Sequence, residues 1–105
     1  MIENFLKNLG LNDNEIRVYL YLLTHGESIA SIVAKRLEMK RATVYQVLES
    51  LEGKELVASF EKNNVAHFDA VEPEDIVQLC EQRVHQMQRI REKAEILKSE
   101  MKKLR

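Results

Sequence analysis

The most constraining feature of the sequence is its last third, which contains nothing that would stop a helix. Glu72-Pro73-Glu74-Asp75 has the features of a helix start, with proline at the first helical position and acidic residues in the first turn. From Glu74 to Arg105 there is no glycine and no further proline. The segment therefore predicts one helix from Pro73 to Arg105, about 50 Å long at ~1.5 Å per residue. A small domain cannot cover a helix of that length.

The second half of this helix carries a narrow apolar stripe at heptad spacing, over about two and a half heptads. The residues at the two seam positions are Met87, Ala94 and Met101, and Ile90, Leu97 and Leu104. A stripe of this kind between charged residues is what a two-stranded coiled coil requires. The alternative is a helix that folds back onto its own domain. We expect a homodimer through these residues, joined by other contacts such as the first helix, and the sequence leaves parallel and antiparallel pairing open.

Hydrophobic periodicity predicts four helices before this segment. A short helix covers Ile2–Asn8 and is stopped by Gly10, and the next begins at Asn12, where Glu15 completes a capping box, and ends at Gly26. We expect Ser28 or Ser31 to cap a third, short helix that ends at Leu37.

The fourth predicted helix runs from Arg41 to Glu52. It has one apolar face, formed by Val44, Val47, Leu48 and Leu51. Its opposite face is therefore left free.

Beyond Gly53 the pattern changes to that of two strands, Leu56–Phe60 and Val65–Ala70. If Phe60 and Phe68 both face the core, they pair with each other and leave a three-residue tip. A two-residue turn at Asn63-Asn64 would instead place Phe60 opposite His67 and Phe68 on the other face. We favour the three-residue tip.

This order of elements is that of a winged helix-turn-helix, a mainly α fold with a small β-hairpin wing. We expect residues 1–72 to form a winged helix-turn-helix DNA-binding domain and residues 73–105 to form a dimerising coiled-coil helix. The fourth helix would enter the major groove of duplex DNA. The candidate DNA contacts are Lys40, Arg41, Ala42, Thr43, Tyr45 and Gln46 on that helix and Lys62 and Asn63 on the wing.

Each contact follows from chemistry that base edges and phosphates recognise. Arg41 and Gln46 can make bidentate hydrogen bonds to guanine and adenine, and Thr43 or Ala42 can touch the thymine methyl group. Lys40, Arg41 and the first amides of the helix can hold phosphates. Taken singly, any of these residues can equally belong to an ordinary solvated surface, so the order of the elements carries the interpretation.

Charge and chemistry exclude several classes of protein. The net charge is −1, but residues 63–82 hold five acidic residues and no Lys or Arg, and residues 83–105 hold eight basic and three acidic residues. No apolar run can span a membrane and no signal peptide is visible, so a cytoplasmic protein is expected. The lone Cys80 fits a reducing compartment. No metal site, cofactor motif or catalytic constellation is present, and we expect no enzyme.

Several stretches resemble the TrmB-type transcriptional regulators. They are Leu9-Gly10-Leu11-Asn12-Asp13-Asn14-Glu15-Ile16-Arg17-Val18-Tyr19-Leu20, Ile32-Val33-Ala34-Lys35-Arg36-Leu37, Lys40-Arg41-Ala42-Thr43-Val44-Tyr45-Gln46-Val47-Leu48, Leu51-Glu52-Gly53-Lys54-Glu55-Leu56-Val57 and Phe68-Asp69-Ala70-Val71-Glu72-Pro73. The resemblance implies a winged-helix DNA-binding domain, a recognition helix starting near Arg41, and regulation at promoters by a dimer. Larger members carry a sugar-sensing domain where this chain ends, so no sugar site is carried over.

We therefore expect a regulator that binds a near-palindromic operator as a homodimer, with recognition helices about one helical turn, roughly 34 Å, apart. The alternative is a winged-helix protein-interaction module without DNA binding. The near-neutral net charge and the acidic stretch after the wing favour that alternative.

Overall fold

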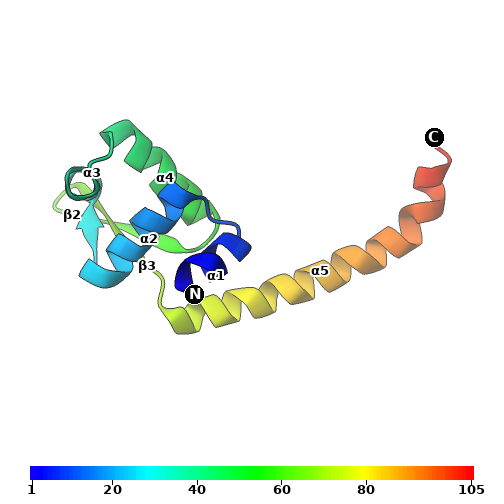
Figure 1. Cartoon of the computed structure of the whole chain (residues 1–105). Coiled ribbons are helices and arrows are strands. Elements are labelled where there is room, and N and C mark those ends of the chain that lie inside the picture. Colours follow the sequence, from blue (N-terminus) through cyan, green and yellow to red (C-terminus); the bar gives the residue numbers. More distant parts are fainter. The chain divides into compact units, whose positions relative to one another are not determined.

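The computed structural model describes every residue from Met1 to Arg105 and divides into two units, Met1–Glu72 and Pro73–Arg105. The elements of the first unit are α1 (Ile2–Asn8), α2 (Asp13–His25), β1 (Ser28–Ile29), α3 (Ala30–Leu37), α4 (Arg41–Gly53), β2 (Val57–Lys62) and β3 (Val65–Ala70). The second unit is the single helix α5 (Pro73–Lys102). Figure 1 shows α5 as one uninterrupted helix.

The predicted ends of the first two helices are confirmed. Asn12 is the N-cap of α2, and its side chain and that of Glu15 accept from each other's backbone N–H, both at 2.9 Å. Gly26 caps the other end with a φ of 85°. Gly10 follows α1 with a φ of 106°, a left-handed conformation in which a side chain would be strained.

The prediction that Ser28 or Ser31 caps the third helix is wrong. α3 begins at Ala30, its N-cap is Ile29, and no side chain caps it. Ser28 and Ile29 instead form β1, which pairs with Phe68 and His67 of β3. The backbone before α3 therefore pairs with β3, and the sequence pattern did not predict this strand.

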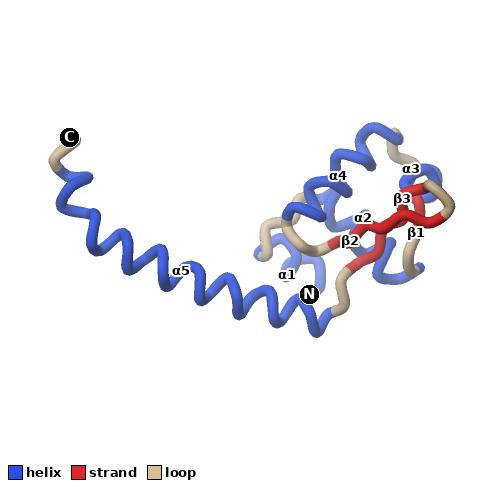
Figure 2. Tube along the Cα trace, turned by 180° about the vertical axis from the view of Figure 1, so that it is seen from behind, coloured by secondary structure: helices blue, strands red, loops and turns tan.

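The sheet is antiparallel with the order β1-β3-β2, and its strands are red in Figure 2. Lys62 pairs with Val65, so the turn contains only Asn63 and Asn64, with φ values of 54° and 63°. Two successive positive φ values are what a type I′ hairpin turn requires.

The prediction of a three-residue tip with Phe60 opposite Phe68 is therefore wrong. Phe60 pairs with His67 and stacks on its ring at 5.6 Å, and Phe60 remains 41% exposed. Phe68 alone is buried, opposite Ser59 on β2 and Ser28 on β1. Only one of the two phenylalanines faces the core.

The core of the first unit is formed where α2, α3 and α4 meet the inner side of the sheet. Tyr19, Leu22, Val33, Leu48 and Leu56 are all at most 1% exposed. The predicted apolar stripe of α4 is buried as well, from Val44 to Leu51. The predicted winged helix-turn-helix is confirmed, with α3 and α4 as the helix-turn-helix and β2 and β3 as the wing.

The long helix of the second unit ends at Lys102, close to the predicted end. Its hydropathy is too low for a membrane span, as is that of every other helix in the chain. Within α5, Glu95 and Lys98 form an ion pair of 2.7 Å one turn apart.

Candidate nucleic-acid interface

The candidate interface is the face of α4 opposite its buried stripe. Since Val44, Val47, Leu48 and Leu51 point into the core, the intervening positions point away from it. Arg41, Ala42, Tyr45 and Gln46 are exposed, and Thr43 is half-buried. The structure thus brings these five predicted contacts together on one face and one end of the helix.

The first turn of α4 is suited to bind an anion. Its N-cap, Lys40, has an extended backbone and makes no side-chain capping bond, and no acidic residue lies in the first turn. The first amide groups of a helix have no partner within the helix, and the helix dipole is positive there. Lys40 and Arg41 are both exposed and add positive charge at the same end.

The turn that leads into α4 is fixed from α2. The Arg17 side chain donates from Nη2 to the carbonyl oxygen of Leu37 at 2.7 Å, at the last residue of α3. Glu38 follows in the left-handed conformation, with φ 53° and ψ 46°, and Met39 N donates to Ala34 O at 2.9 Å. These bonds set the direction in which α4 starts.

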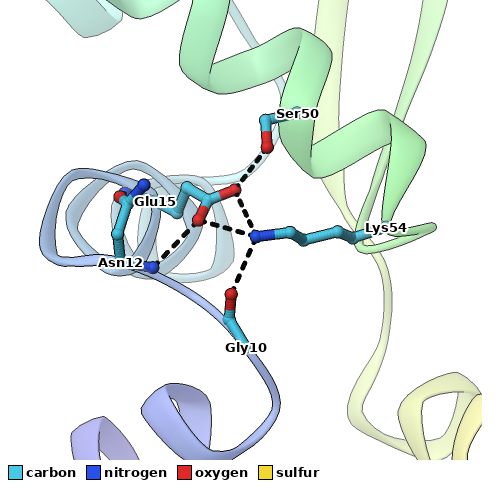
Figure 3. A network of polar contacts seen from close by, with 5 residues as sticks. All are labelled: Gly10, Asn12, Glu15, Ser50 and Lys54. Atoms are coloured by element: carbon cyan, nitrogen blue, oxygen red, sulfur yellow. Dashed lines mark hydrogen bonds and ion pairs between the residues drawn. The ribbon is translucent and has the colours of Figure 1, made fainter. Parts of the chain in front are cut away.

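The far end of α4 is held by a buried carboxylate. Glu15 is 1% exposed, and Lys54 Nζ lies 2.8 Å from its Oε1 and 2.9 Å from its Oε2. Ser50 Oγ donates to Oε2 at 2.6 Å, and Lys54 also donates to the carbonyl oxygen of Gly10 at 2.8 Å. Figure 3 shows Lys54 reaching from the end of α4 to both the start of α2 and the preceding loop. We call this set the Glu15 cluster: Gly10, Asn12, Glu15, Ser50 and Lys54.

Two opposing effects act on the pKa of Glu15. Burial favours the neutral acid and raises the pKa, but the bonds from Lys54, Ser50 and the Asn12 amide, together with the charge of Lys54, outweigh it. The pKa of Glu15 is therefore below its ordinary value of 4.5. The carboxylate stays charged at neutral pH and α2 stays tied to α4.

The structure separates the two wing residues from the others. Lys62 and Asn63 line a groove of about 310 Å³ with residues of β1, α3 and β3, such as Ile32 and His67, and not with residues of α4. Lys62 Nζ also lies 3.5 Å from Glu27 Oε1, so its charge is partly compensated. Thr43 and Gln46 instead line a groove of about 480 Å³ with Asn12 and other residues at the start of α2.

The six predicted dimerisation residues are all exposed, five of them on α5 and Leu104 just beyond its end. They are Met87, Ile90, Ala94, Leu97, Met101 and Leu104. Ile90 also lines a shallow groove of about 460 Å³ with Gln86, Arg89 and Lys93.

The sequence pattern did not reveal the roles of Arg17, Ser50 and Lys54. The capping box pointed to Glu15 as a local cap, but nothing in its spacing indicated the cation that contacts both of its carboxylate oxygens. Lys54 lies 39 positions from Glu15 in the sequence. Residue type alone does not reveal a contact over that distance.

Comparison with protein families and solved structures gives a consistent result. The sequence profile of the family described as "Sugar-specific transcriptional regulator TrmB" matches residues 6–74. No curated protein sequence matches the chain significantly.

Among solved structures, the archaeal chromatin protein TrmBL2, described as showing a novel mode of DNA binding, is 26% identical, with a TM-score of 0.71. The similarity covers 99% of this chain but 39% of TrmBL2. The Zα domain of zebrafish PKZ is 32% identical over 58% of this chain and 95% of that domain, with a TM-score of 0.56. A second PKZ Zα structure, in complex with ds(CG)6, is 30% identical over 59% of this chain and 100% of that chain, with a TM-score of 0.56.

A possible transcriptional regulator from Methanosarcina mazei is 18% identical, with a TM-score of 0.65 over 97% of this chain and 87% of that one. At this identity the similarity concerns the fold alone.

Proposed function

The chain belongs to the TrmB family of transcriptional regulators, and from that premise we propose that it binds duplex DNA as a homodimer. In this proposal α4 lies in the major groove, and its first turn holds a backbone phosphate. Binding at an operator then controls transcription from the neighbouring promoter.

The single observation that carries the proposal is the state of α4. Its exposed side chains can hydrogen-bond to base edges, and its first turn is cationic and uncapped. Its far end is bonded to α2 through Ser50 and Lys54, and the end of α3 before it is bonded to α2 through Arg17. A surface helix that only contacts solvent does not need a fixed orientation. A helix that binds base edges needs one, because base recognition depends on hydrogen bonds of about 3 Å.

The homodimer is supported by the apolar stripe on α5. The five large apolar side chains of the stripe, Met87, Ile90, Leu97, Met101 and Leu104, are each at least 37% exposed. An apolar surface of this extent is covered by a partner in most proteins that carry one. Since related half-sites on DNA follow the two-fold symmetry of a dimer, a near-palindromic operator is expected.

The test is fluorescence anisotropy with genomic duplex fragments, random duplex and ds(CG)6, each titrated with salt. We expect fragment-selective binding that weakens as salt rises, because bound phosphates release counterions. Arg41→Ala should cost about 1–3 kcal/mol of binding free energy and relax the preference at one base position. Lys7→Ala is the matched control, since it removes one positive charge from α1, where Lys7 is exposed beside Asp13 at 3.8 Å.

The second candidate function is a winged-helix interaction module that does not bind DNA. Two observations favour it: Lys62 on the wing pairs with Glu27, and residues 63–82 carry five acidic residues and no Lys or Arg. If the folded protein gives the same anisotropy with all three duplexes, and this anisotropy does not depend on salt, the result would favour this second function over the first.

A further inference from the structure

The apolar stripe of α5 contains information on the direction in which two copies pair. In heptad letters, Met87, Ala94 and Met101 are at a, and Ile90, Leu97 and Leu104 are at d. In a parallel pair each a residue faces its own copy, and so does each d residue. In an antiparallel pair each a residue faces a d residue of the partner.

We propose that α5 pairs with a second copy of itself in antiparallel orientation, with Ala94 of one chain facing Leu97 of the other. This inference rests on the homodimer of the proposed function. It goes beyond it by assigning the register and by placing the two winged units at opposite ends of the helix pair.

Side-chain volumes in the stripe favour antiparallel pairing. With Ala94 opposite Leu97 of the partner, Ile90 faces Met101 and Met87 faces Leu104, so all six residues find an apolar partner. The smallest residue of the stripe is then matched with a large one. In parallel pairing Ala94 faces Ala94, which leaves one layer underfilled between layers of Ile and Leu, and core layers of uneven volume pack poorly.

The charged residues beside the stripe also differ in their pairing between the two orientations. Gln86, Lys93 and Glu100 are at g, and Arg91, Lys98 and Arg105 are at e. In the antiparallel register g faces g, so Lys93 lies beside Glu100 of the partner, twice by symmetry. In the parallel register g faces the next e, so Lys93 lies beside Lys98 of the partner. The attractive parallel pair, Glu100 with Arg105, needs a residue that lies beyond the end of α5 at Lys102.

The antiparallel register also brings Arg91 beside Lys98 of the partner. Lys98 forms the 2.7 Å ion pair with Glu95 of its own helix, which reduces this repulsion and also reduces the Lys93–Lys98 repulsion of the parallel register. The groove of about 460 Å³ beside Ile90 is lined by Arg89 and Lys93 on the same side, where the partner's carboxylate approaches.

Arg83 occupies the d position immediately before Met87. A parallel pair that continues toward the start of α5 would bring Arg83 opposite its own copy, with two like charges in the seam. The antiparallel register overlaps only residues 87–104, so Arg83 lies outside the seam.

Electron spin resonance distance measurements distinguish the two orientations. His85 and Ser99 are exposed and both lie at f, on the side away from the stripe. Each is changed to cysteine and spin-labelled in a Cys80→Ser background, in which the label site is unique. The oligomeric mass of each variant is measured first by analytical ultracentrifugation, and its helicity by circular dichroism.

A parallel pair gives nearly equal distances at the two sites, about 20 Å, which is set by the width of two helices. The antiparallel register displaces the two His85 positions by about 32 Å along the axis but the two Ser99 positions by only about 10 Å. We therefore expect the His85→Cys distance to exceed the Ser99→Cys distance by about 15 Å. Equal distances in a dimer would overturn the antiparallel pairing and leave the homodimer standing.

A charge substitution provides a second, independent readout. Lys93→Glu places like charges beside Glu100 in the antiparallel pair, so the dimer dissociation constant should rise by about five- to tenfold at low salt. Adding Glu100→Lys should restore it. In the parallel pair Lys93→Glu would instead face Lys98 and tighten the dimer.

A tightened dimer, or no change, would contradict the proposal. A monomer for the unsubstituted chain would overturn both this inference and the homodimer. DNA binding by α4 is measured separately by anisotropy, so its failure is distinguishable from either result.

Discussion

The Glu15 cluster makes a strong prediction about what orients α4. Lys54→Met removes the ammonium group and retains a side chain of similar length. Glu15 then keeps its bonds from Ser50 Oγ at 2.6 Å and from the Asn12 amide at 2.9 Å, but it has lost both contacts with Lys54. A carboxylate that is 1% exposed is left without its counter-charge.

The expected cost follows from the geometry. Removing one partner of a buried ion pair typically costs about 3–5 kcal/mol, and a hydrogen bond to a charged group contributes about 1.5–3 kcal/mol. The Lys54 side chain is itself 32% exposed, so solvent screens part of the interaction. We therefore expect Lys54→Met to lower the free energy of unfolding by about 2–3 kcal/mol.

The assay is urea denaturation at fixed protein concentration, followed by tyrosine fluorescence. All three tyrosines, Tyr19, Tyr21 and Tyr45, lie in the first unit and the chain has no tryptophan, so the signal reports on that unit. Glu15→Gln and the double variant complete a mutant cycle. The double variant should be more stable than Lys54→Met alone, because it no longer buries an uncompensated charge.

The pH dependence of the free energy of unfolding tests the role of the Glu15 charge. Because Lys54 and the other bonds lower the pKa of folded Glu15, its contribution to stability is present above the unfolded pKa near 4.5 and is lost as pH falls through the folded pKa. Lys54→Met removes the largest of the effects that lower this pKa, so the variant should lose less stability on acidification and its destabilisation should shrink. A coupling energy below about 0.5 kcal/mol in the cycle, or a destabilisation that does not depend on pH, would refute the reasoning.

Two further predictions concern the first unit. Tyr19→Phe should cost about 1 kcal/mol of unfolding free energy, because it removes the 3.0 Å bond from Tyr19 Oη to Val71 O. Burial, and then the charge of Glu72, raise the pKa of Tyr19. The stability that Tyr19 contributes is therefore present below pH ~10 and is lost as pH rises through the folded pKa. Urea denaturation in a series of alkaline buffers should show this loss of stability in the unsubstituted chain but not in Tyr19→Phe. Asn64→Gly should raise the unfolding free energy by a few tenths to about 1 kcal/mol, because glycine suits the second position of a type I′ turn. Destabilisation of this variant in thermal melts would contradict the two-residue turn.

The helices could be predicted because their signals are local. The capping box at Asn12 and Glu15 and the glycines at 10 and 26 each act within a few residues of the helix end that they define. The apolar stripe of α4 follows from a period of 3.6 residues, and the structure buries the same positions.

The sheet was harder to predict because its signals are not local. Ser28 and Ile29 form a strand only because β3 lies beside them, and Ser28 is 40 positions from its partner Phe68. The register of the hairpin depended on whether Phe60 faces the core. An aromatic residue can also be accommodated on the outer face, where Phe60 stacks on His67, so its hydrophobicity did not decide the question.

The Glu15 cluster shows why a candidate site can be predicted only in part from its own segment. The exposed face of α4 follows from the positions that are buried, and those can be inferred within the helix. The orientation of that face depends on Arg17, Glu15 and Lys54, which act across α2, α3 and α4. A substitution at Glu15 should therefore alter DNA binding without any contact to DNA, because it loosens the end of α4 while leaving Arg41 and Gln46 in place.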